Sequence, residues 1–154
     1  MPGQRERLRR FRAVLALGLL IVGLGLLLTQ CPANRDGMPG QLAQAMEETS
    51  GAARSGALAL DLWIQRRSTA QLTGVQVTDA RDEVIKAYQG IADLKAEDPM
   101  DIARQRMLTA AMTTIIERLN AASATLRGVT DGPALPAVRR DLLTAADALE
   151  TGYR

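Results

Sequence analysis

The polar and apolar positions of this chain follow two patterns, one uninterrupted apolar run and then four segments with a helical period. The run extends over seventeen uncharged residues from Ala13 to Thr29, and the sequence stays uncharged through Ala33. At about 1.5 Å per residue, a helix over residues 13–33 is about 31 Å long, which matches the hydrocarbon thickness of a bilayer. The first pattern therefore predicts one N-terminal transmembrane helix at residues 13–33.

The residues that precede the run are strongly basic. Residues 1–12 contain five arginines and a single acid, Glu6. Positively charged flanks of membrane helices stay on the cytoplasmic side, so we expect a cytoplasmic N-terminus and a main domain beyond the membrane. Arginine outnumbers lysine 17 to 2, a composition typical of GC-rich bacterial genomes. We therefore expect the bacterial inner (cytoplasmic) membrane, with the main domain periplasmic or extracellular.

The end of the run, Leu28-Thr29-Gln30-Cys31, resembles the bacterial lipobox, in which the cysteine is acylated and becomes the first residue of the mature chain. Gln30 departs from that motif, which has a small residue before the cysteine. The alternative is an uncleaved signal anchor, because the apolar run exceeds the usual signal-peptide core of about 7 to 15 residues. A signal peptide cleaved elsewhere is the third interpretation. Cys31 is accordingly a lipidation site, a partner in an intermolecular disulfide, or a small apolar residue at the end of the span.

Two glycines of the run, Gly18 and Gly25, are seven residues apart and therefore lie on nearly the same helix face. The missing side chains on that face allow another membrane helix to approach closely. The alternative is that glycine is simply tolerated in the span. Packing of the predicted membrane helix at these two positions is thus a hypothesis.

Beyond the run, the sequence predicts a short hinge and then a helical domain at residues 41–154. Residues 34–40, NRDGMPG, have the glycine, proline, asparagine and aspartate content of a connection. From residue 41 onward, apolar and small residues recur at spacings of four and three, the period of an amphipathic helix. The stripe predicted for the first helix is Leu42, Met46, Thr49, Ala53, Gly56, Leu60 and Trp63.

Four residues of this first helix carry specific expectations. Thr49 is the polar member of the stripe, and its hydroxyl is expected to donate to a carbonyl of the preceding turn. Trp63 is expected in the core. Gly51 and Gly56 each cost about 1 kcal/mol relative to alanine inside a helix, which predicts a kink or a close helix contact near residue 50.

The segment between Ala70 and Thr78 contains Gly74 and β-branched residues that interrupt the helical pattern, which predicts a connection. Thr78 is then the expected N-cap of a second helix. The stripe of that helix is Ala80, Val84, Ala87, Ile91 and Leu94. The connection is either an ordinary loop or a contact patch for a partner, formed by its apolar side chains Leu72, Val75 and Val77.

The clearest helix start lies at Asp98, an N-cap residue followed by Pro99 and, in the first turn, by Asp101. The stripe of this third helix is Leu108, Met112, Ile115, Leu119, Ala122 and Leu126, and Gly128 is expected to end it. The stripe of the fourth helix is Leu135, Val138, Leu142, Ala145, Leu149 and Tyr153. The fold class is therefore all-α, a transmembrane helix followed by an antiparallel bundle of three to four helices.

The composition removes most reactive chemistry. The chain contains no histidine and one cysteine, so the commonest general base, the commonest metal ligand and any pair of thiolates are absent from the sequence. We find no nucleophile motif, phosphate-binding glycine loop or calcium-loop spacing, and the acids Glu47, Glu48, Asp61 and Glu117 are expected on a solvated face. The sequence thus predicts no catalytic residues, no metal site and no cofactor.

The net charge of the predicted domain is small. Setting aside the five arginines and Glu6 of the first 34 residues leaves 14 basic and 16 acidic residues, a net charge of −2. A nucleic-acid partner would require a clustered basic face. We therefore expect no nucleic-acid partner. From the predicted membrane helix we expect membrane lipid and an integral membrane protein complex or other envelope protein as the partners.

Three hypotheses for function remain. The first is a non-catalytic accessory or structural subunit, anchored in the membrane, that docks on a larger bacterial membrane complex from the periplasmic or exterior side. The second is an envelope lipoprotein that serves as a scaffold or binder. The third is a ligand-sensing bundle that signals through a partner, since a membrane-tethered helical bundle resembles in architecture the extracytoplasmic domains of chemoreceptors and sensor kinases.

Overall fold

A computed structural model describes residues 37–129 and 131–153, and within these ranges it contains four helices and no strands. The basic flank at 1–12, the predicted membrane helix at 13–33 with its residues Gly18, Gly25 and Cys31, and hinge residues 34–36 lie outside the described residues. Among the residues described, no helix is both long and apolar enough to cross a membrane. The expectation of an all-α domain with four helices is confirmed.

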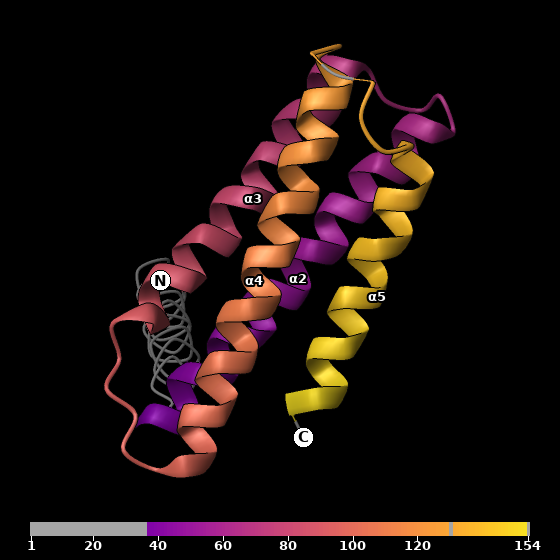
Figure 1. Cartoon of the computed structure of the whole chain (residues 1–154). Coiled ribbons are helices and arrows are strands. Elements are labelled where there is room, and N and C mark those ends of the chain that lie inside the picture. The colour runs from indigo at the N-terminus through magenta and orange to yellow at the C-terminus, as the bar shows by residue number, and fades with distance from the viewer. Residues whose placement is uncertain (1–36, 130, 154) are drawn as a thin grey trace, which may run out of the picture. The chain divides into compact units, whose positions relative to one another are not determined.

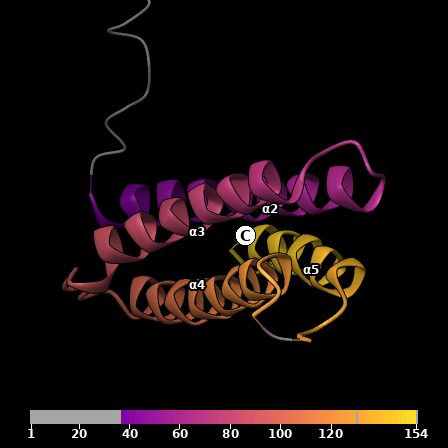
Figure 2. The same cartoon turned by 90° about the horizontal axis from the view of Figure 1, so that it is seen from above.

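The four helices form an antiparallel bundle with up-and-down connections (Figure 1). They are α2 (Met38–Ile64), α3 (Ala70–Ala92), α4 (Pro99–Leu126) and α5 (Leu135–Tyr153). Helices α2 and α3 form one layer and α4 and α5 the other (Figure 2). Helix α2 contacts all three other helices, whereas α3 and α5 occupy opposite corners and do not touch.

The core is built from the stripes that the period of four and three predicts. Each helix turns one apolar face inward, because burying that face is the main favourable contribution to folding. The largest fully buried apolar side chains are Leu42, Leu60, Val77, Val84, Ile91, Leu108, Met112, Ile115, Leu119, Val138 and Leu142. On α5, Ala146 is buried and Ala145 only partly so, which shifts the predicted stripe by one residue there.

Helix α2 approaches its neighbours closely because small residues line its buried face. Five alanines of α2 are buried in the core. At Gly56, a Cβ atom would lie 2.7 Å from Cδ2 of Leu119 on α4, so only glycine fits this crossing without a shift. Gly51 is exposed, and a Cβ there would meet nothing within 4 Å. The close contact predicted near residue 50 is thus at Gly56.

Two expectations for α2 are wrong. The Thr49 hydroxyl does not donate to a preceding carbonyl; its Oγ1 is buried and has no hydrogen-bond partner among the residues described. Trp63 is half-buried and not part of the core cluster, because it lies in the last turn of α2, where the neighbouring helices no longer surround it. Leu60, one turn earlier, is the last fully buried residue of the helix.

The first helix begins three residues earlier than expected. Helix α2 starts at Met38, so residues 38–40 of the predicted hinge belong to its first turn. Pro39 lacks an N–H that the first turn of a helix would leave unpaired anyway, and its fixed φ suits that position. Gly37 precedes the helix with a φ of 85°, which only glycine adopts easily.

The second helix begins nine residues earlier than expected, so the predicted connection between Ala70 and Thr78 is wrong. Thr69 is the N-cap of α3 and its Oγ1 accepts a hydrogen bond from the Leu72 N–H at 3.2 Å. Thr78 Oγ1 instead donates to the Gly74 carbonyl at 2.8 Å, inside the helix. Burial of Thr73 and Val77 against the other helices outweighs the low helix propensity of Gly74 and its β-branched neighbours.

Both ends of the third helix are confirmed. Asp98 caps α4 by accepting from the Met100 N–H at 2.8 Å, with Pro99 at the first position. At the other end Gly128 has a φ of 68°, and the N–H of Val129 donates to the Ala124 carbonyl at 3.0 Å. This is the glycine-terminated arrangement that satisfies the last carbonyls of a helix.

Candidate docking surface

The exposed apolar side chains of the described residues gather at one end of the bundle. We call this the two-loop end, because the α2–α3 and α4–α5 connections both lie there, at the top of Figure 1. Five of the six large apolar side chains exposed in the described ranges lie on helix turns or loops adjoining it: Leu58, Ile64, Leu72, Val75 and Val129. The sixth, Met100, lies at the opposite end, at the start of α4.

Two of the three predicted contact residues lie on this surface. Leu72 and Val75 are 53% and 56% exposed on the outer face of the first turns of α3. Val77 is fully buried, so its assignment to the contact patch is wrong. The reason is the helical period: residues 73, 77 and 80 share the inward face of α3, whereas 72, 75 and 79 share the outward face.

A groove of about 400 Å³ runs beside these residues, between the first turns of α3 and the last turns of α4. Small side chains leave the space open: a Cβ on Gly74 would meet nothing within 4 Å. The groove is lined by Ala70, Gln71, Gly74, Val75, Thr78, Asp79, Ser123 and Arg127. The sequence pattern does not reveal it because it requires α4 to lie against α3.

A second hollow, of about 280 Å³, lies on the other side of the same α3 face, between α2 and α3. Exposed Leu58 and half-buried Leu62 of α2 supply its apolar lining. Asp79 borders both this hollow and the groove. The outward face of α3 is therefore a ridge flanked by two depressions.

The charges around the groove are unevenly placed. Arg66, Arg67 and Arg127 at the two-loop end are exposed and make no ion pair with any residue that the structure describes. Arg127 Nε donates to the Ser123 carbonyl at 3.2 Å. The one carboxylate that lines the groove is Asp79, more than two helical turns from the start of α3.

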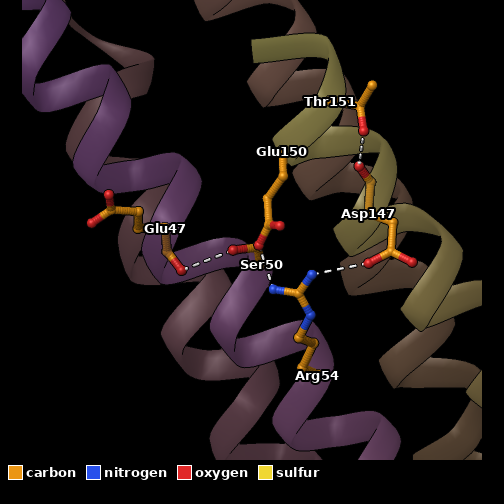
Figure 3. A network of polar contacts seen from close by, with 6 residues as sticks. All are labelled: Glu47, Ser50, Arg54, Asp147, Glu150 and Thr151. Atoms are coloured by element: carbon orange, nitrogen blue, oxygen red, sulfur yellow. Dashed lines mark hydrogen bonds and ion pairs between the residues drawn. The ribbon is translucent and has the colours of Figure 1, made fainter. Parts of the chain in front are cut away.

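By contrast, the exposed charges between α2 and α5 are paired within the bundle (Figure 3). Arg54 of α2 forms an ion pair with Glu150 and another, at 2.9 Å, with Asp147, both on α5. The hydrogen bonds to Glu150 and then Asp147 raise the pKa of the Arg54 guanidinium above its ordinary value. Nearer the two-loop end, Arg139 pairs with Asp61 at 3.0 Å. These pairs attach α5 to α2.

The carboxylates of residues 37–129 and 131–153 show no arrangement for a metal. Among the residues described, no three or more cysteine or acidic side chains come together in a way that could hold a metal ion. Asp101, the one buried acid of these ranges, faces Arg104 with 3.6 Å between Oδ1 and the guanidinium nitrogen.

Comparison of the chain with protein-family models, with curated proteins and with solved structures gave no match.

Proposed function

We propose that this chain is a non-catalytic accessory or structural subunit of a larger bacterial membrane complex. In this proposal, residues 13–33 anchor it in the inner membrane with the N-terminus in the cytoplasm, and the bundle docks from the periplasmic or exterior side. Gly18 and Gly25 would face another membrane helix of the same complex. Its partners are then an integral membrane protein complex or another envelope protein, together with membrane lipid.

The observation that carries the proposal is the gathering of exposed apolar side chains at the two-loop end. Single exposed leucines or valines are common on protein surfaces, but several at one end of a bundle, with a groove beside them, are typical of an interaction site. Leu72 and Val75 project from a regular helix and not from a loop, so they are presented rigidly. Rigid presentation lowers the entropy lost on binding.

Purification of the full chain in mild detergent, followed by mass spectrometry, tests the proposal. We expect a larger membrane complex to co-purify at fixed stoichiometry. The double variant Leu72→Ser/Val75→Ser should lose that complex, whereas Met100→Ser, an equally exposed apolar position at the other end, should retain it. A monomeric chain with nothing attached, or equal retention by both variants, would contradict the docking role.

An envelope lipoprotein acting as scaffold or binder is the second candidate, supported by the lipobox-like sequence that ends at Cys31. The intact mass of the purified protein separates the two. A chain that lacks Met1 to Gln30 and carries added acyl mass is a lipoprotein. A chain that retains these residues is held by an uncleaved anchor, and Cys31 is then unmodified.

A further inference from the structure

We propose that the two-loop end binds an acidic amphipathic helix of a partner protein, whose apolar side chains enter the groove between α3 and α4. This inference rests on the proposed docking function and specifies the chemistry of the partner. Three observations support it: the extent of the groove, the exposed apolar side chains beside it, and three exposed arginines at the two-loop end that make no ion pair with a described residue.

The shape fits a helix. The groove follows the α3–α4 interface from residues 70 and 71 to residues 78 and 79, about two helical turns. Gly74 and Val75 both line it, and Leu72 is exposed on the same outward face of α3. Binding of an amphipathic helix by laying its apolar face into such a groove is a recurrent mode of recognition.

The charge indicates that the partner is acidic. Arg127 lines the groove, and Arg66 and Arg67 occupy the connection that leads into α3. Arg54 is paired with carboxylates of the same chain, whereas these three, like Arg106 and Arg140 elsewhere on the bundle, make no ion pair with a described residue. What distinguishes the three is their place at the two-loop end, beside its exposed apolar side chains. Arginines around an apolar centre are typical of protein interfaces, where they select a partner of opposite charge.

A groove with Asp79 on its margin also favours a helix over a lipid surface. A flat bilayer would contact the ends of the loops and leave a depression unfilled, and an anionic one would repel Asp79. A partner helix, unlike a lipid surface, can carry carboxylates at some positions and none at others. They can face Arg127, on the loop side of the groove, and be absent opposite Asp79. Helices α3 and α4 are antiparallel, and Arg81 of α3 meets Asn120 of α4 at 3.5 Å, so Arg127 lies nearer the start of α3 than Asp79 does.

The test measures peptide binding to the full chain held in nanodiscs of neutral phosphatidylcholine. The probes are two synthetic amphipathic helices of about 18 residues, with identical leucine stripes and either glutamate or lysine on the flanks. We expect the glutamate peptide to bind about tenfold more tightly than the lysine peptide, and its affinity to fall as salt is added. Equal affinities for the two peptides, or no binding of either, would overturn the inference.

Charge reversal locates the binding. The variant Arg66→Glu/Arg67→Glu/Arg127→Glu reverses the three arginines of the two-loop end. It should lower the affinity for the glutamate peptide by about tenfold or more. A matched control reverses three other cations without an ion pair in the described residues, Lys86→Glu/Lys95→Glu/Arg106→Glu. The control should change the affinity by less than about twofold. An equal loss in both variants would show a general effect of net charge and would refute the proposed site.

Filling the groove provides a test that does not involve charge. Gly74→Leu places a side chain where a Cβ meets nothing within 4 Å, so the bundle should fold while the groove is occupied. Gly90→Leu is the matched control, since Gly90 also lies in α3 with open space around its Cβ. Only Gly74→Leu should lower the affinity for the glutamate peptide. Unchanged binding by that variant would exclude the groove as the site.

These outcomes are separable from those of the proposed function. If neither peptide binds but a larger complex still co-purifies, the inference of an acidic helix as the partner is wrong, and the proposed role as a subunit is unaffected. Binding of phosphatidylglycerol vesicles that depends on the three arginines, with neither peptide bound, would make the surface a lipid site and the inference wrong.

Discussion

Thr49 lies fully buried in α2 with no hydrogen-bond partner for its hydroxyl in the described part of the chain. A buried polar group without a partner loses its hydration and gains nothing in return. We expect Thr49→Val to raise the free energy of unfolding by about 1 kcal/mol, because valine has the same shape without the hydroxyl. Urea denaturation followed by circular dichroism measures the change.

Thr73→Val is the control for this substitution. Thr73 is equally buried, but its hydroxyl donates to Ser68 Oγ at 2.9 Å. Removing that bond should lower the free energy of unfolding by about 1 kcal/mol. A loss of stability in both variants would indicate that the Thr49 hydroxyl does have a partner.

The two glycines in the middle of α2 should respond to alanine in opposite directions. At exposed Gly51, alanine meets no other atom and should raise the free energy of unfolding by about 1 kcal/mol through its higher helix propensity. At Gly56, its Cβ would lie 2.7 Å from Leu119 Cδ2, and we expect a net loss of about 1 kcal/mol. Thermal unfolding midpoints compare the two, and similar gains at both positions would contradict the close α2–α4 crossing.

At the scale of the element, the end of α2 is less well matched to its sequence than the end of α4. Both helices end with a residue of positive φ and the same pair of backbone bonds. In α4 that residue is Gly128, but in α2 it is Arg66, with a φ of 58°. A residue with a Cβ is strained in this conformation. The sequence therefore has no glycine to mark the end of α2, although the backbone there has the geometry of a glycine-terminated helix.

Arg66→Gly should relieve this strain. We expect the free energy of unfolding to rise by about 1 kcal/mol. Arg67→Gly removes the same charge from the next residue, where the φ is not positive, and should show no such gain. Chemical denaturation of the two variants makes the comparison, and an equal response would indicate that the loss of charge is the cause.

The start of α3 shows how far local signals reach. Asp98 and Pro99 predict the start of α4 because the cap, the proline and the first-turn acid agree there. At the start of α3, Thr69 and Thr78 are both suitable N-cap residues. Gly74, which lies between them, has a low helix propensity and so favours the later start at Thr78. Propensities differ by less than about 1 kcal/mol among these choices. Burial of Thr73 and Val77 outweighs that small difference and extends the helix to Ala70.

At the scale of the whole molecule, packing of four helices decides which apolar residues are core and which are surface. Leu72→Ser and Val75→Ser should each change the free energy of unfolding by less than about 0.5 kcal/mol, because both side chains are largely exposed. Val77→Ser should lower it by about 2–3 kcal/mol, since it creates a cavity and buries a hydroxyl. Urea titrations of the three variants provide the measurement, and similar losses at all three would place Leu72 and Val75 in the core.

The sequence by itself determined the all-α class, the four helices and nearly all of their buried stripes, because a period of 3.6 residues is a local property of the chain. It also determined the start and end of α4, where capping residues act within one turn. Only the tertiary structure decided the start of α3, the burial of Val77 and the contact of Gly56 with Leu119, since each depends on a helix distant in sequence. The candidate docking surface divides in the same way: exposed Leu72 and Val75 were expected from the sequence, while the groove exists only because α3 and α4 lie side by side.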